Sequence, residues 1–298
     1  MVKFGTSIYC LTRLIVKGTM TPVEAFNTLC DMGTEVVELV PFGFDIVDDP
    51  ALQKELLAAA DARGVPIENF SLNANFLMIS PAEYEAQMER AKKHIDACAD
   101  MGIPTIRVDS AAFNRPISEN TIENFEKELP TIVGAYETLC DYAARRGMTV
   151  LLENHGFHAN GSDRVRRILT SVKRENFGHQ LDVGNYICVD DRPEIAVKKM
   201  IPFAKTIHMK DFYIRPFDRD PGGSSQFACE NSWFRSSNGT YLRGSILAQG
   251  DLDMRLIIKT IKESGFDGNI FLEYEGMEDC LYATSVSLSN MKRLWNEA

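Results

Sequence analysis

The segment TVLLENHGFHANGSDRVRRILTSVKRENFGHQLDVGN, residues 149–185, contains two apolar runs with a helical pattern between them. Thr149–Glu153 and Gln180–Val183 are predicted strands, and Asp163–Val172 has the periodicity of a helix. A strand, a helix and a second strand in this order are typical of a βαβ unit, whose two strands belong to one parallel sheet. The segment therefore predicts an α/β fold.

The same alternation continues on both sides of this segment. The other predicted strands are Lys3–Ser7, Val36–Val40, Ile67–Leu72, Thr105–Asp109, Thr206–Met209 and Asn269–Glu273. Helices are expected after Thr21 and over Ala82–Met101, Asn120–Arg146, Arg192–Met200 and Asp251–Ser264. Eight strands, each followed by a helix, in 298 residues predict a single domain, residues 1–298, with the (β/α)₈ TIM-barrel fold.

One long insertion follows the seventh predicted strand. Residues 212–250 are rich in Gly, Ser, Asn and aromatic residues and contain no clear helical pattern. Such loops usually act as lids or binding loops, and the alternative is a disordered segment. Trp233 favours order and, with Phe42 and Phe76, could form an apolar wall for a sugar ring. Gly222–Ser225 could bind an anion through its backbone or serve as a flexible hinge.

Composition and charge narrow the class of protein. Hydrophobic residues make up 45% of the chain, and 42 acidic against 32 basic residues give a net charge of −10. This balance disfavours binding to nucleic acid or to a membrane surface. No apolar run approaches the roughly 20 residues of a membrane-spanning helix, and the first residues do not resemble a secretion signal. The seven cysteines form no CxxC pair. We therefore expect a cytoplasmic globular protein.

Four polar residues end four consecutive predicted strands: Glu153, Asp182, His208 and Glu273. In a parallel barrel the carboxyl ends of the strands meet at one mouth, so these side chains should converge. Three carboxylates and one imidazole form a ligand set for a divalent metal, because a cation offsets the repulsion between buried carboxylates. The set suits Mn²⁺, Mg²⁺, Co²⁺ or Zn²⁺. The alternative is that the acids form ordinary salt bridges and that the histidine belongs to the core.

The motifs that carry these residues are LLENHG, LDVGN, IHMKD and FLEYEG, with AQGDLD before the last helix. In this order they resemble the xylose isomerase-like (β/α)₈ superfamily, also described as AP endonuclease family 2, across nearly the whole chain. That superfamily contains sugar isomerases and epimerases, inosose dehydratases and endonuclease IV-type nucleases.

The resemblance implies one divalent metal, most simply Mn²⁺, held by Glu153, Asp182, His208 and Glu273. It also implies that Glu153 and Glu273 are catalytic and lie on opposite faces of the bound sugar. A metal bound to a carbonyl and its neighbouring hydroxyl stabilises an enediolate, while one carboxylate removes a proton and the other returns it. The implied activity is that of an isomerase or epimerase acting on a ketose or a related small carbohydrate.

Further residues are candidates for binding the substrate: Glu38, Arg107, His155, Lys210 and Arg243. Glu38 and Arg107 end predicted strands and could instead pair with each other, whereas Arg243 in the insertion could be a solvated surface residue. Lys210 follows His208 by two residues and so shares its face of the strand. His155 could act as an extra base, bind a hydroxyl or orient a neighbouring group. A homo-oligomer is a further expectation.

The chain departs from the ketose 3-epimerases at two places. Asn185 stands where these enzymes have a histidine, and the stretch from His155 to His158 replaces an acidic residue. A dehydratase or lyase acting on a keto-sugar or inosose is therefore an alternative, because the same enediolate can expel a hydroxyl that an acid protonates. Two less favoured alternatives are a non-catalytic sugar-binding barrel and an endonuclease IV-like nuclease. The nuclease would need extra histidines where Asn73, Arg107 or Asp109, and Asn185 stand.

Overall fold

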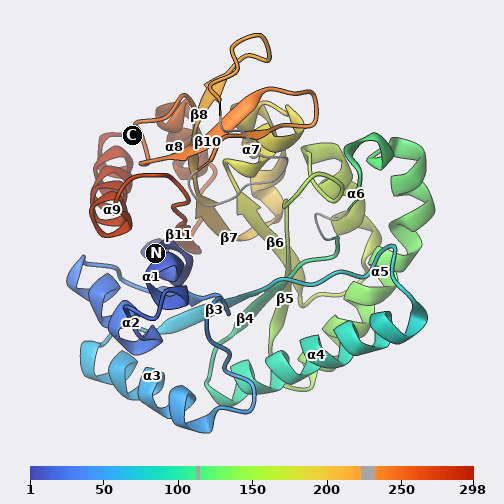
Figure 1. The fold of residues 1–298 in the computed structure, drawn as a ribbon. Helices are drawn as coiled ribbons and strands as arrows, with labels where there is room; N and C mark the ends of the chain where they lie inside the picture. The colour runs from blue at the N-terminus through green and yellow to red at the C-terminus, as the bar shows by residue number, and fades with distance from the viewer. Residues whose placement is uncertain (112–114, 223–231) are drawn as a thin grey trace.

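Eight parallel strands close into a barrel in the order β1-β11-β7-β6-β5-β4-β3-β2 (Figure 1). The computed structural model describes residues 1–111, 115–222 and 232–298. The barrel strands are β1 (Lys3–Ser7), β2 (Val37–Leu39), β3 (Ile67–Leu72), β4 (Thr105–Val108), β5 (Thr149–Glu153), β6 (Phe177–Asp182), β7 (Ala204–Met209) and β11 (Asn269–Leu272). This topology confirms the predicted (β/α)₈ TIM barrel.

The helices lie on the outside of the barrel (Figure 1). They are α1 (Thr12–Val16), α2 (Pro22–Asp31), α3 (Pro50–Arg63), α4 (Pro81–Asp100), α5 (Ile122–Ala144), α6 (Ser162–Ser171), α7 (Pro193–Met200), α8 (Met254–Glu263) and α9 (Cys280–Glu297). Short 3₁₀ helices occur at η1 (Ile8–Leu11), η2 (Ile117–Glu119), η3 (Asn185–Val189) and η4 (Ile201–Phe203). The helices α2 and α4 both begin with a capping box and a proline, which explains why their starts are readable in the sequence.

Strand β6 begins earlier than predicted, at Phe177 rather than Gln180. The difference arises at His179, whose polar side chain interrupts the apolar pattern although it is fully buried. Its Nδ1 lies 2.9 Å from the carbonyl oxygen of Leu152. A satisfied polar side chain can occupy a buried strand position at little cost. The core positions of this strand therefore extend beyond its apolar run.

The insertion differs from the predicted loop because part of it forms a three-stranded antiparallel sheet. Its strands are β8 (Asp211–Arg215), β9 (Phe234–Arg235) and β10 (Tyr241–Ser245), in the order β8-β10-β9. Phe212, Phe234 and Leu242 of this sheet pack with Phe157 and Cys188 in a separate apolar cluster. The sheet is thus anchored beside the segments that follow β5 and β6. The predicted anion contact at Gly222–Ser225 lies almost wholly outside the described residues, because residues 223–231 are not described.

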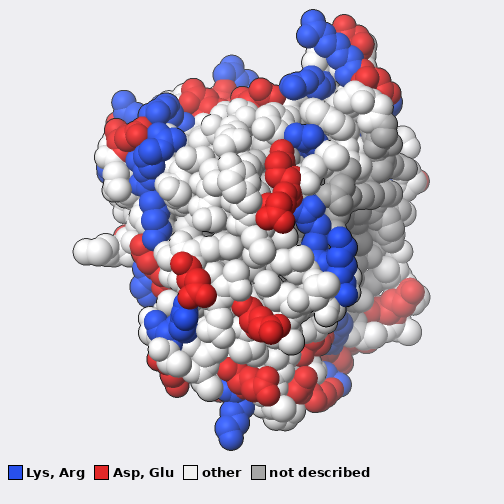
Figure 2. All heavy atoms as spheres, turned by 60° about the vertical axis from the view of Figure 1, so that its left-hand side comes forward, with Lys and Arg blue, Asp and Glu red and all other residues white. Residues whose placement is uncertain are grey.

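Acidic and basic side chains are intermingled on the face shown in Figure 2. Within the described ranges, no helix combines the length and the apolar character needed to cross a membrane.

Candidate metal centre

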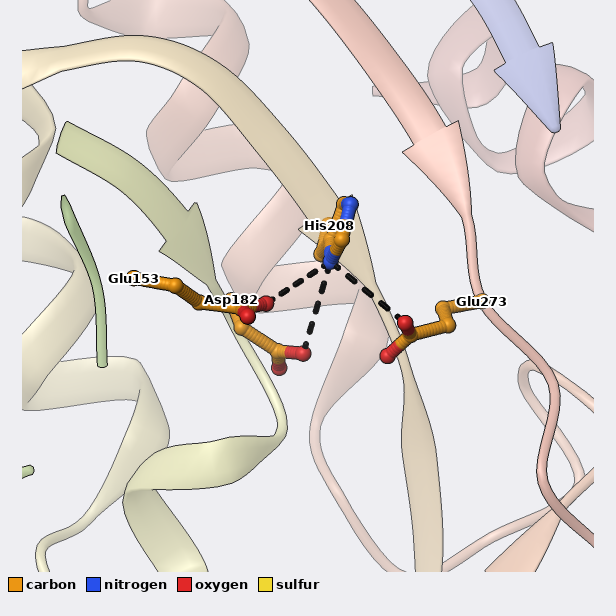
Figure 3. A group of neighbouring side chains, drawn as sticks. All are labelled: Glu153, Asp182, His208 and Glu273. Atoms are coloured by element: carbon orange, nitrogen blue, oxygen red, sulfur yellow. Dashed lines mark ion pairs between the residues drawn. The ribbon is translucent and has the colours of Figure 1, made fainter. Parts of the chain in front are cut away.

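The four predicted metal ligands converge inside the barrel. They come from the ends of β5, β6 and β7 and from the residue after β11, and all four are buried. One ligand atom of each, from Glu153, Asp182, His208 and Glu273, lies within 4.8 Å of those of the other three. Figure 3 shows the three carboxylates facing the same edge of the histidine ring.

The imidazole nitrogen Nδ1 of His208 is the centre of this group. It lies 2.8 Å from Oε1 of Glu153, 3.8 Å from Oε1 of Glu273 and 4.0 Å from Oδ2 of Asp182. The parallel pairing of β6 with β7 places Asp182 opposite His208, which explains why residues 26 positions apart in the chain meet here.

The donor set fits a divalent cation. Oδ1 of Asp182 accepts hydrogen bonds from the backbone N–H groups of Gly184 and Asn185. Oδ2 of the same carboxylate is buried and accepts no hydrogen bond from the part of the chain that is described, and its contact with the Nζ of Lys210 is an ion pair of 3.5 Å. A buried carboxylate oxygen without a donor is costly, and a cation would remove that cost. These residues could therefore hold one metal ion.

Burial and charge shift the pKa values of the group in opposite directions. Burial raises the pKa of Asp182 to about 6, against the effect of Lys210, and Glu153 and Glu273 raise it further. Burial also disfavours the ionised form of Glu153, but Arg107 and His208 outweigh it and hold the Glu153 pKa well below its usual range. Each pKa shift is the balance between burial and the charges that lie within a few ångströms of the carboxylate.

Glu38 lies behind the histidine, on the side away from the three carboxylates. Its Oε2 is 2.8 Å from Nε2 of His208 and accepts hydrogen bonds from Asn69 Nδ2 and Ser71 Oγ at 2.6 and 3.0 Å. Glu38 is fully buried on β2 and does not line the cavity described next. Its position favours a role in holding His208, whereas the sequence suggested contact with the substrate.

A cavity of about 310 Å³ opens beside the ligand group. Its lining residues come from seven of the eight barrel strands or the segments that follow them: Tyr9, Thr12, Val16, Val40, Phe42, Asn73, Arg107, His155, Lys210, Glu273 and Glu275. The rings of Tyr9 and Phe42 lie 5.7 Å apart and form an apolar wall. Phe42 is thus where the sequence placed it, whereas Phe76 packs on Tyr84 in the core.

Both cations that line the cavity are engaged in ion pairs. Arg107 lies 2.9 Å from Asp109 and 3.1 Å from Glu153, and so pairs with these acids rather than with Glu38. Lys210 lies 2.5 Å from Oε2 of Glu273 and 3.4 Å from Glu275. Each of the two glutamates expected to be catalytic therefore has one oxygen held by a cation and the other directed toward His208.

His155 forms a second polar pair at the cavity. Its Nδ1 lies 3.0 Å from Oδ2 of Asp109, and the ring is 24% exposed. Burial works against protonation of His155, but Asp109 outweighs it and raises the His155 pKa. A carboxylate at one ring nitrogen orients the other for proton transfer, so this pair could act as an acid or base.

Asp109 and Glu275 were missed as site residues at the sequence level. A signal existed for both, because Asp109 follows Arg107 by two residues and Glu275 follows Glu273 by two, and alternate residues of a strand share a face. Asp109, Glu153 and His155 also form a group that could hold a metal. However, Arg107 pairs with both carboxylates of that group, and a positive charge at this position disfavours the several metals of an endonuclease IV-like site.

Arg243 lies away from the cavity. It is on β10, with its guanidinium 4.8 Å from the ring of Tyr213 and 5.4 Å from that of Trp233, and it pairs with Glu278 at 3.3 Å. Neither Arg243 nor Trp233 is among the residues that line the cavity. The residues that line the cavity therefore give no support for the suggested contacts of Arg243 and Trp233 with a substrate.

The family model for xylose isomerase-like TIM barrels, AP endonuclease family 2, matches residues 26–294, and the chain belongs to this family. An inosose dehydratase from Lacticaseibacillus casei is 24% identical over 250 residues, which cover 82% of this chain and 77% of that protein.

Two solved structures extend the comparison to the fold. The 3-keto-D-glucoside 4-epimerase from E. coli superimposes with a TM-score of 0.70 at 16% identity, covering 98% of this chain and 100% of that one. A xylose isomerase-like barrel from Mycobacterium smegmatis, solved in complex with magnesium, superimposes with a TM-score of 0.71 at 15% identity. The match covers 99% of this chain and 97% of that one. The proteins similar to this chain in sequence or fold thus include a dehydratase, an epimerase and a barrel solved with magnesium.

Proposed function

We propose that this protein is a metal-dependent isomerase or epimerase that moves a proton on a small carbohydrate through an enediolate. The observation that carries the proposal is the convergence of Glu153, Asp182, His208 and Glu273 beside a cavity large enough for one sugar. A divalent ion at these residues would polarise the substrate carbonyl and its neighbouring hydroxyl and so acidify the carbon atom between them.

Glu153 and Glu273 supply the base and the acid. Oε2 of Glu153 is held by Arg107 and Oε2 of Glu273 by Lys210, so both carboxylates are fixed in direction before the substrate arrives. Such fixed orientation favours proton transfer, because little reorganisation is left for the reaction itself. One carboxylate takes the proton from carbon, and the other, once protonated from solvent, gives a proton to the opposite face or to the neighbouring carbon.

A dehydratase is the second candidate, and the pair of His155 with Asp109 favours it. After a glutamate has taken the proton from carbon, the neighbouring C–O bond breaks, a C=C bond forms, and His155 protonates the departing hydroxyl to give water. The position of His155 at the cavity, and the inosose dehydratase among the relatives, support this route.

Solvent-deuterium incorporation tests the step that both routes share. Free ketoses, aldoses, keto-sugars and inososes would be incubated in D₂O with Mn²⁺-loaded enzyme and examined by mass spectrometry. Deuterium uptake without other mass change supports an isomerase or epimerase, and uptake with loss of water supports the dehydratase. No uptake with any sugar, at confirmed metal occupancy, would contradict the proposal and favour a non-catalytic binding barrel.

A pair of variants separates the two routes. Glu273→Gln should abolish deuterium uptake in either case, since it removes a proposed base. His155→Gln should abolish loss of water while deuterium uptake persists if the enzyme is a dehydratase. A His155→Gln variant that loses neither activity would leave His155 without a role in proton transfer.

A further inference from the structure

We propose that the cavity is selective for an uncharged monosaccharide or cyclitol and that Glu275 excludes phosphorylated and carboxylated sugars. This inference rests on the proposed function for the carbohydrate nature of the ligand, and it adds the charge class of that ligand. It depends on three features of the described residues: the balance of charge around the cavity, the hydrogen-bonding groups of a small pocket that adjoins it, and the size of that pocket.

The charge around the cavity is unfavourable for an anion. The two lining cations, Arg107 and Lys210, are paired with five carboxylates between them: Asp109, Glu153, Asp182, Glu273 and Glu275. With His155 neutral, a divalent ion would still leave one negative charge in excess among these groups. Residues 112–114 and 223–231 could add no cation, because these segments contain no Lys, Arg or His.

Beside the cavity, Asn185 offers a donor and Glu275 an acceptor to a ligand. The amide nitrogen Nδ2 of Asn185 is buried and has no hydrogen-bond partner among residues 1–111, 115–222 and 232–298. Glu275 lies on the other side of Lys210, whose Nζ is 3.4 Å from Oδ1 of Asn185 and 3.4 Å from Oε2 of Glu275. A sugar hydroxyl can accept from Asn185 and donate to Glu275, whereas a phosphate dianion or carboxylate only accepts.

The space between these groups is small. A pocket of about 30 Å³ adjoins the larger cavity and is lined by His155, Asn185, Lys210 and Glu275, three of which line both. It has room for a hydroxyl group or a water molecule, but not for a phosphate. The larger cavity, with the wall of Tyr9 and Phe42, suits the C–H face of one sugar ring.

Ligand binding tests this inference without requiring turnover. Dissociation constants would be measured by saturation-transfer NMR on Mg²⁺-loaded protein, because Mg²⁺ is diamagnetic. The neutral probes are D-fructose, D-glucose and 2-keto-myo-inositol, and the matched anionic probes are D-fructose 6-phosphate and D-glucuronate. We expect at least one neutral probe to bind, and its anionic counterpart to bind about tenfold more weakly or worse.

Two variants locate the origin of the selectivity. Glu275→Gln should reduce the preference for neutral over anionic probes by about tenfold, because it removes one of the negative charges that line the cavity. Asn185→Asp keeps the oxygen that faces Lys210 but loses the donor, so it should weaken the binding of the neutral probes by about five- to tenfold. Glu263→Gln, which removes an equal charge at the exposed end of α8, is the control. It should change neither the preference for neutral probes nor their binding affinity.

Three results would overturn the inference. These are anionic probes that bind as tightly as their neutral counterparts, neutral probes that do not bind at all, and a Glu275→Gln variant with unchanged preference. Failure of the proposed function gives a different pattern: neutral sugars would bind selectively but take up no deuterium. In that case the charge selectivity would stand and the proton-transfer reaction would not.

Discussion

The carboxylate of Glu38 lies 2.8 Å from Nε2 of His208, while Nδ1 of the same ring faces Glu153, Asp182 and Glu273. Both side chains are fully buried. With a metal ion bound, Nε2 would donate its proton to Glu38, which would leave the lone pair of Nδ1 free to act as a ligand. A carboxylate behind a metal-binding histidine fixes the tautomer and the ring orientation.

We predict that Glu38→Gln weakens metal binding about 10- to 100-fold, the usual cost of losing such an outer partner. Glutamine can still accept a hydrogen bond from the ring, but it lacks the charge that favours the correct tautomer. Competition with a fluorescent chelator for Mn²⁺ measures the dissociation constant. Glu68→Gln, which alters a half-buried glutamate on β3 paired with Lys3, is the matched control. Equal metal affinity in both variants would refute the role of Glu38.

Metal binding should weaken as the pH falls below about 6. Burial raises the pKa of Asp182 to about 6, so a proton competes with the metal for this carboxylate in acid. A metal ion that binds the folded state stabilises it, and tighter binding stabilises it more. Mn²⁺ should therefore raise the melting temperature at pH 8 and raise it less at pH 5. Chelation should reverse the effect. An equal metal-induced shift at both pH values would contradict this assignment.

Sequence patterns predicted the barrel and the four converging residues for the same physical reason. The carboxyl ends of parallel barrel strands meet at one mouth, so a polar residue that ends an apolar run has a known place in the fold. Glu153 and Asp182 are the last residues of β5 and β6 in the structure, and Glu273 directly follows β11. Their meeting required no knowledge of individual contacts.

Contacts that depend on register or on long-range pairing could not be predicted in this way. Glu38 belongs to a three-residue strand and points to the inside of the barrel, where only the position of β7 reveals His208 as its partner. The three-stranded sheet pairs Tyr241 with Arg215 across 26 residues, and its strand β9 has two residues. Neither feature leaves a periodic signal, because so short a strand has no measurable alternation.

If His155 is the acid of the dehydratase route, Asp109→Asn should lower turnover by about 10- to 100-fold while metal affinity stays within twofold of the parent. Asp109 holds Nδ1 of His155 at 3.0 Å, and a positioned acid or base typically contributes at least this much to rate. The variant also loses the charge opposite Arg107, so the dissociation constant for Mn²⁺ reports whether the metal group is disturbed. A large loss of metal affinity would show that Asp109 acts through Arg107 and Glu153 instead.

The stability of the fold should fall between pH 6.5 and pH 4 because of buried histidines. Burial lowers the pKa of His179 to about 4, against a normal value of 6.5, and burial together with Arg115 lowers that of His158 to about 4. The unfolded chain therefore takes up protons below pH 6.5 that the folded protein accepts only near pH 4. For His179 this difference amounts to at most about 3 kcal/mol of unfolding free energy. Urea unfolding at a series of pH values measures how steeply the unfolding free energy falls with pH.

His179→Asn keeps a donor near the position of Nδ1 but cannot be protonated. The variant should therefore be less stable at every pH, yet its stability should decline less steeply below pH 6.5. A decline as steep as that of the parent would place the pH dependence elsewhere.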